Sequence, residues 1–119
     1  MGAWDVGVLE NDIALDAMGA IAGEIQEVIT ETLLNSEYEE EVLLGVALVD
    51  ASLNGSSKDI VGCFYEYKPY FDGLKPMGTF RDKALKMIRT FDTKSWNKEY
   101  REKRQAIYNT LEKRLESAS

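Results

Sequence analysis

The chain has 119 residues, which suits one domain (residues 1–119) and is too short for two separate hydrophobic cores. Hydrophobic residues make up 45% and charged residues 29%, so disordered and collagen-like chains are excluded. The formal net charge is −7, and there is no histidine. Without histidine there is no Ser-His or Cys-His nucleophile pair and no mixed Cys/His zinc site. We therefore expect a binding protein, with no enzymatic activity and no cofactor.

The charge is divided unevenly along the chain. Residues 1–60 carry thirteen acidic side chains against Lys58 alone, for a net charge of −12, whereas residues 61–119 carry a net charge of +5. This polarity predicts either a charged partner or packing of the two halves against each other. The negative total disfavours nucleic-acid binding, because phosphate contacts need a basic surface.

Composition also bears on location. Cys63 is the only cysteine, so it cannot form an internal disulfide; it fits a reducing compartment and is expected to be buried as a small hydrophobic residue. No stretch approaches the ~20 apolar residues of a membrane span, and the N-terminus lacks the layout of a signal peptide. The sequence predicts a cytoplasmic protein that does not bind membranes.

The first 34 residues predict an ordered arm followed by a long helix. Residues 1–9 are too rich in glycine for a good helix, and Asn11 or Asp12 provides a cap at the start of a helix over about residues 12–34. The predicted apolar stripe of this helix has 3-and-4 spacing and comprises Ala14, Met18, Ile21, Ile25, Val28 and Thr32, widened by Ala17, Ile29 and Leu33.

A second helix is predicted almost immediately after the first. Ser36 and Glu39 have the spacing of a capping box. The segment that follows is apolar on every side apart from Asp50, so we expect this helix to be the central one. Asn54 and Gly55 are expected to end it in the left-handed conformation. With only a residue or two between them, the two helices should form an antiparallel hairpin.

The sequence from residue 60 onwards predicts one short element and two further helices. Residues 60–67 fit a strand or a short helix, and we favour a helix because the chain offers no second strand to pair with it. Thr79 and Asp82 are spaced to cap a third helix, and Asp92 or Thr93 opens the last one. The fold class predicted is all-α: a compact bundle of about four main helices and a short one, with an ordered N-terminal arm.

Apolar positions on these two later helices share one face of each. On the third helix they are Phe80, Ala84, Met87, Ile88 and Phe91, and on the last they are Trp96, Tyr100, Ile107, Leu111 and Leu115. The side chains expected in solvent on the last helix are Lys98, Arg101, Glu102, Arg104 and Lys113.

The first sixteen residues, MGAWDVGVLENDIALD, resemble the opening of a bacterial family classed as a domain of unknown function. Its members typically begin Met-Gly-Ala/Thr-Trp-Gly-x-Gly-x-Phe-Glu/Asp-Asn-Asp-x-Ala-x-Asp. Asp5 and Leu9 depart from this pattern, and a Leu-Lys-Pro stretch at residues 74–76 and Trp96 extend the resemblance loosely. The resemblance implies a small, mainly helical protein without an established activity. The residues that match are Trp4, Gly7, Glu10, Asn11, Asp12, Ala14 and Asp16.

The acidic side chains of the first two helices are the main candidate for a partner-binding surface. Glu24, Glu27 and Glu31 project from one side of the first helix. The same pattern is typical of an ordinary solvent-exposed helix face. Placed against a basic toxin or nuclease, such a surface raises association rates at low salt. The start of the second helix enlarges it with Glu37, Glu39, Glu40 and Glu41.

Two further clusters have two interpretations each. Tyr65, Tyr67 and Tyr70 lie beside a Pro-containing loop and are either binding hot-spot residues or a roof over the helical core. Glu10, Asp12 and Asp16 offer oxygen ligands for a divalent cation, but hard-cation sites usually draw more oxygens from a loop. We favour capping and anchoring for these acids, and no metal.

The basic residues of the third and fourth helices are expected to form salt bridges with the acidic half, in preference to following a phosphate backbone. They are Arg81, Lys83, Lys86, Arg89, Lys94, Lys98, Arg101, Lys103 and Arg104.

These observations predict an acidic protein-binding domain, an immunity or antitoxin-like protein of bacteria that neutralises a toxin by covering its basic surface. One alternative is a metal-binding protein or enzyme that uses the N-terminal acids. Another is a structural adaptor that binds through the aromatic segment alone.

Overall fold

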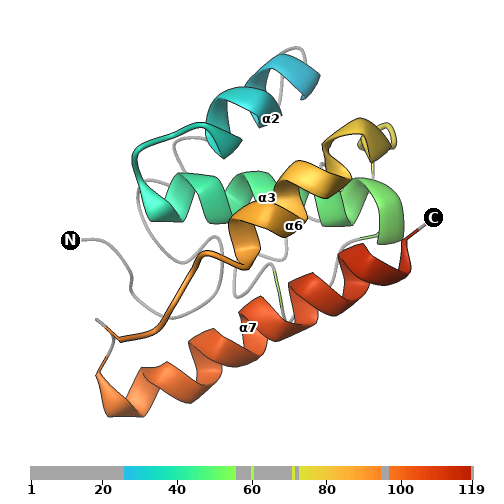
Figure 1. Cartoon of the computed structure of the whole chain (residues 1–119). Helices are drawn as coiled ribbons and strands as arrows, with labels where there is room; N and C mark the ends of the chain where they lie inside the picture. Colours follow the sequence, from blue (N-terminus) through green and yellow to red (C-terminus); the bar gives the residue numbers. More distant parts are fainter. Residues whose placement is uncertain (1–25, 56–59, 61–70, 72, 95–96, 119) are drawn as a thin grey trace.

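The computed structural model describes residues 26–55, 60, 71, 73–94 and 97–118 (Figure 1). In these residues the elements are α2 (Gln26–Leu34), α3 (Glu39–Asn54), the 3-10 helix η2 (Gly78–Phe80), α6 (Arg81–Ile88) and α7 (Lys98–Ser117). The described part contains helices and no strand, which confirms the all-α prediction. The predicted arm, the start of the first helix, Cys63 and Trp96 lie outside it. Ile60, which opens the segment predicted as strand or helix, is helical and buried.

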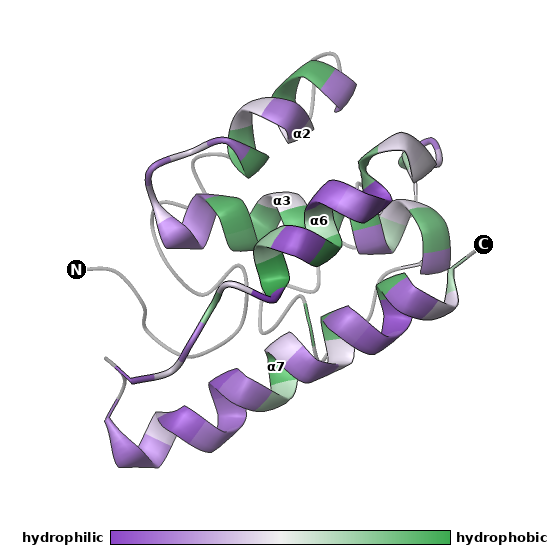
Figure 2. Cartoon of the chain, in the orientation of Figure 1, coloured by the Kyte–Doolittle hydropathy of each residue, from purple (hydrophilic) through white to green (hydrophobic). Residues whose placement is uncertain are grey.

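The second helix is the central one, as predicted. Residues 42–51 of α3 are buried in an unbroken run, and Figure 2 shows the helix as mostly hydrophobic beyond its first turn. A helix that is apolar all round must be covered on all sides. The helices α2, α6 and α7 all pack against α3.

The helix α2 faces the core with only part of the predicted stripe: Leu33 is buried and Ile29 packs against the core. Val28 and Thr32 are exposed, and the buried residues are Thr30, Leu33 and Leu34. Two adjacent leucines bury more apolar area than a valine and a threonine, so they set the rotation of the helix about its axis. The prediction that Val28 and Thr32 belong to the buried stripe was therefore wrong.

Close packing of α2 against α3 depends on Gly45. A Cβ atom at this position would come within 3.1 Å of Leu34 Cδ2 and 3.2 Å of Leu33 Cβ. The two helices run in opposite directions in Figure 1, as expected of a hairpin. Four residues, 35–38, connect them where one or two were predicted.

The capping box predicted at the start of α3 does not form. The helix begins at Glu39 with Tyr38 as its N-cap, without a side-chain cap. Ser36 is used differently, because its Oγ donates to Glu41 Oε1 and accepts from the Tyr38 N–H at 3.0 Å. The serine thus braces the loop between α2 and α3.

Three other predicted helix ends also need correction. Gly55 follows α3 with a φ of 82° and a ψ of 161°, so its φ is positive but its conformation is not left-handed helical. Thr79 lies within η2, and α6 begins after it without a side-chain cap. Asp92 Oδ1 accepts from the Lys94 N–H at 3.0 Å, which turns the chain before α7. The cap of α7 is Asn97, whose side chain accepts from the Tyr100 N–H at 3.1 Å.

The apolar faces of α6 and α7 pack as predicted. Ala84 and Ile88 are buried in α6, with Leu85 as an addition. Ile107, Leu111 and Leu115 are buried in α7. Arg104 is also buried there, although it was predicted to lie in solvent.

Two arginines hold the C-terminal end of α7: one is the first residue of α6 and the other directly follows that helix. Arg81 Nε donates to the Leu115 carbonyl at 2.7 Å, and Arg81 Nη2 donates to the Glu116 carbonyl at 2.8 Å. Arg89, directly after α6, forms an ion pair with Glu112 at 2.7 Å. Cations at a helix C-terminus interact favourably with its unpaired carbonyls.

A Gly45→Val substitution should separate α2 from α3. The added methyl groups meet Leu33 and Leu34, which are buried and lack space to move, so we expect the free energy of unfolding to fall by about 1–3 kcal/mol. Urea unfolding followed by circular dichroism measures this change. Gly78→Val is the control, because a Cβ at Gly78 meets nothing within 4 Å; equal losses in both variants would contradict the packing argument.

Candidate protein-binding surface

Two acidic residues at the start of α3 form contacts with α7 inside the protein. The Arg104 side chain is 0% exposed, and its Nη2 pairs with Glu40 Oε1. Arg104 Nε donates to Tyr108 Oη at 2.9 Å, and the tyrosine hydroxyl donates to Glu39 Oε1 at 2.8 Å. This network joins the first turn of α3 to the middle of α7.

A second ion pair joins the other end of α3 to α7. Arg114 Nε lies 2.8 Å from Asp50 Oδ2 and 2.9 Å from Asp50 Oδ1, and the Asp50 side chain is 2% exposed. Asn54 Nδ2 donates to the same carboxylate at 3.0 Å. Arg114 Nη2 also donates to the Gly55 carbonyl, so the pair fixes the end of α3 as well.

Burial changes the acidity of these groups. Desolvation raises the pKa of Glu40 above its usual value, although the charge of Arg104 acts in the opposite direction. Desolvation likewise raises the pKa of Asp50 against the hydrogen bonds from Arg114 and Asn54. It also raises the pKa of the Tyr108 hydroxyl, which therefore stays protonated as a donor to Glu39.

These two ion pairs join the oppositely charged halves, which is one of the two outcomes predicted from the charge division. The expectation for the individual basic residues was only partly right, because Arg81 and Arg89 pair with acids of their own half and Arg114 was not among those named.

Of the predicted surface, Glu40 is paired with Arg104 and its side chain is 18% exposed, so it offers a partner less than the exposed acids do. Glu39 stays exposed at the edge of the network. Glu41 is half-buried and accepts from Ser36.

The other predicted acids of the described part remain on the outside. Glu27, Glu31 and Glu37 are exposed, and none of them has an ion pair with another described residue. They lie on α2 and in the loop after it, a region we call the α2–α3 corner (residues 27–41). The carboxylates of Glu27, Glu31 and Glu37 are therefore exposed and make no ion pair within the described part of the chain.

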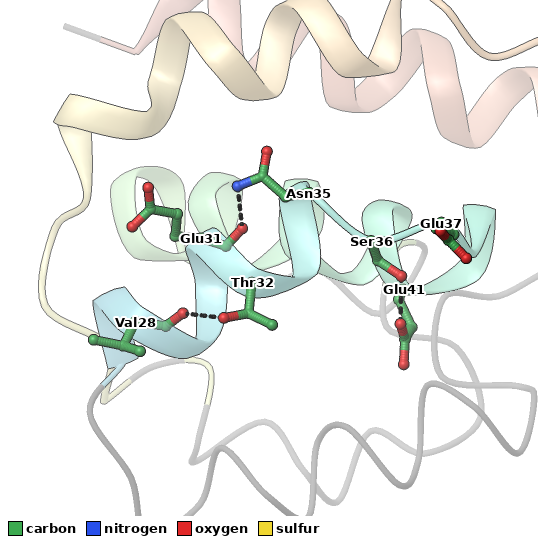
Figure 3. A pocket seen from close by; sticks show the side chains of 7 residues that line it. All are labelled: Val28, Glu31, Thr32, Asn35, Ser36, Glu37 and Glu41. Carbon is green, nitrogen blue, oxygen red and sulfur yellow. Dashed lines mark hydrogen bonds between the residues drawn. The ribbon is translucent and has the colours of Figure 1, made fainter.

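An open hollow of about 540 Å³ lies in the α2–α3 corner. Figure 3 shows how its lining is braced: Thr32 Oγ1 donates to the Val28 carbonyl at 2.8 Å, and Asn35 Nδ2 donates to the Glu31 carbonyl at 3.0 Å. The lining comprises Val28, Glu31, Thr32, Asn35, Ser36, Glu37 and Glu41.

A second hollow of about 280 Å³ is lined in part by the same loop. It is lined by Ser36 and Glu37 of the loop, by Glu39 and Val42 of α3, and by residues 90–92 after α6. Ser36 and Glu37 belong to both hollows. The two hollows are thus neighbours that share part of their lining.

The sequence did not point to three exposed residues of this region. Val28 is 57% exposed and Tyr38 is 60% exposed. They are the exposed large hydrophobic residues of the described part of the chain. Val28 was assigned to the core stripe, and Tyr38 carried no motif. Asp92 was predicted as a helix start, and only the path of the chain after α6 brings it to the second hollow.

The remaining predicted site residues lie outside the described part of the chain. They are Glu24, Tyr65, Tyr67 and Tyr70 of the binding surface, and Trp4, Gly7, Glu10, Asn11, Asp12 and Asp16 of the N-terminal motif. Among the residues that are described, no group of three or more acidic side chains is placed to hold a metal ion. None of the described helices combines the length and apolar character needed to cross a membrane.

Comparison with known proteins found no matching family model, no similar curated protein and no similar solved structure.

Arg104→Ala should destabilise the fold strongly. The substitution removes the buried guanidinium that pairs with Glu40 and donates to Tyr108, and breaking a buried pair in this way costs about 3–5 kcal/mol in the free energy of unfolding. Thermal and urea unfolding measure the loss. Lys98→Ala, at an exposed position of the same helix, should change stability by less than about 0.5 kcal/mol. A similar small change for Arg104→Ala would show that the network contributes little.

The raised pKa values of Glu40 and Asp50 predict a pH dependence. The folded chain binds the protons of the Glu40 and Asp50 carboxyl groups more tightly than the unfolded chain does. The contribution of these two groups to stability is therefore greatest at a pH below their ordinary pKa values of 4.5 and 3.8. It is lost as the pH rises through the folded pKa values. The wild-type protein should therefore lose stability relative to the E40Q/D50N variant between pH 3.8 and neutrality. Urea unfolding of both proteins across this range gives the difference, and a constant or rising difference would contradict the prediction.

Proposed function

We propose that this chain is a small acidic protein-binding domain of the immunity or antitoxin type, which neutralises a cognate toxin by covering its basic surface. The observation that carries the proposal is the division of the acidic residues. Glu39, Glu40 and Asp50 take part in contacts with α7, whereas Glu31 and Glu37 remain exposed around a hollow. Ion pairs among the described residues therefore do not account for the negative charge of Glu31 and Glu37.

Electrostatics favour a basic partner for such a corner. Clustered charges of one sign steer a complementary protein to its site and raise the association rate, an effect that weakens as salt increases. The exposed Val28 and Tyr38 supply apolar contact area next to the charges. Tyrosine is enriched among residues that dominate binding energy.

The N-terminal signature supports a further part of the proposal. On its resemblance we propose that the chain belongs to the bacterial family of unknown function that opens with this pattern. We also propose a cytoplasmic location, in keeping with a single cysteine and with a partner that must be neutralised inside the cell.

Charge reversal on the corner tests the proposal. The full chain is co-expressed with each protein encoded beside it, and a growth defect caused by one of these proteins should be relieved. For that pair, E31K/E37K should slow association at low salt by about tenfold and relieve toxicity less, because both carboxylates line the hollow. Stopped-flow fluorescence measures the association rate.

The matched control is E99K/E102K. Glu99 and Glu102 are exposed on α7, so this variant has the same change in net charge away from the corner. It should associate at nearly the wild-type rate. Equal slowing of both variants would mean that only net charge matters, and failure to relieve the toxicity of any neighbouring protein would refute the immunity function itself.

A further inference from the structure

The second hollow combines apolar and acidic walls. Val42 is buried at 3% exposure, and the Phe91 ring is held against the Tyr108 ring with a centroid separation of 5.2 Å. The acidic residues Glu37, Glu39 and Asp92 come from the α2–α3 loop, the start of α3 and the segment after α6. Three separate segments thus bring carboxylates to one place beside an aromatic and an aliphatic side chain.

This combination matches the chemistry of a long basic side chain. Lysine and arginine have an aliphatic stem that packs on apolar surface and a cationic head that stays among polar groups. The head is attracted to carboxylates and to the face of an aromatic ring such as Phe91. Arginine fits best, because its guanidinium has five donors for several carboxylates at once.

The first hollow repeats the arrangement across the loop. Its carboxylates are those of Glu31, Glu37 and Glu41, and its exposed apolar side chain is Val28. Because Ser36 and Glu37 line both hollows, the two depressions are neighbours. A single partner segment that crosses the loop therefore passes over both.

We propose that the two hollows are paired subsites for two basic side chains, preferably arginines, on one segment of the partner that straddles the α2–α3 loop. The proposal rests on the proposed function and names the chemistry of the partner at that surface. Glu37 contacts both side chains as the shared wall, and Phe91 and Asp92 belong to the second subsite.

A cation bound in the second subsite should also change the environment of Tyr108 in the interior. Glu39 lines this hollow and accepts the hydrogen bond of Tyr108, and Phe91 packs on the same tyrosine. A cation beside Glu39 changes the electric field at the Tyr108 hydroxyl. The resonances of Phe91 and Tyr108 are therefore built-in reporters for this subsite.

The test is a nuclear magnetic resonance titration of the full chain with the peptide hexaarginine. Chemical shift changes should concentrate on Val28, Val42, Thr90, Phe91 and Tyr108 and should weaken with salt. Hexacitrulline, whose side chains have nearly the same shape without the charge, should produce none of these changes. The E37Q/D92N variant should weaken hexaarginine binding by about fivefold, because both carboxylates lose their charge while their shape is kept.

The control variant E99Q/E102Q has the same net charge as E37Q/D92N and should bind hexaarginine within about twofold of the wild type. Shift changes spread over the whole surface, equal weakening by both variants, or binding of hexacitrulline would each overturn the paired subsites. If hexaarginine maps to the hollows but no neighbouring protein is neutralised, the subsites stand and the immunity function fails. If a neighbouring protein is neutralised while hexaarginine maps elsewhere, the immunity function stands and the paired subsites fail.

Discussion

A guanidinium group without contact to water must be surrounded by acceptors, and Arg104 imposes this condition on the interface between α3 and α7. Its partners include Glu40 on α3 and Tyr108 one turn further along α7. Leaving any member unpaired in this setting costs more than a surface ion pair contributes. The register of α7 along α3 is therefore restricted to positions that satisfy the network, and the Asp50–Arg114 pair adds a second fixed point along the interface.

The same constraint bears on three of the described arginines. Arg81, Arg104 and Arg114 each donate to more than one acceptor, including backbone carbonyls at helix ends. A planar guanidinium with several fixed donors can bridge a side chain and a carbonyl at once, whereas an ammonium group is more strongly hydrated. Lys86, Lys98 and Lys113 are accordingly exposed. Replacing arginine by lysine at the three bridging positions would keep the charge and lose the geometry.

The sequence was sufficient for the fold class and for the central place of α3, because a run of apolar residues that covers every side of a helix has few alternatives. The apolar faces of α6 and α7 were likewise predictable from their spacing. The outward position of Val28 and Thr32 on α2 was not, because the sequence does not show that Leu33 and Leu34 pack closely against Gly45 of α3. Caps failed for a related reason: Ser36 and Asp92 have more than one local hydrogen-bond partner, and the path of the chain selects the one used.

The candidate site was predictable only as a set of acidic residues, because the sequence does not say which carboxylates will be neutralised inside. Four consecutive positions at the start of α3 illustrate the point. Tyr38 and Glu39 are exposed, Glu40 turns inward to a buried arginine, and Glu41 braces the loop through Ser36. Successive residues of a helix point about 100° apart, so a run of glutamates cannot all face one partner. Residues that share a face come instead from α2, the loop and the segment after α6, and their proximity is a consequence of how α2 and α6 pack on α3. Within the described part of the chain, the negative surface thus consists of acids of α2 and the following loop that make no ion pair with α7.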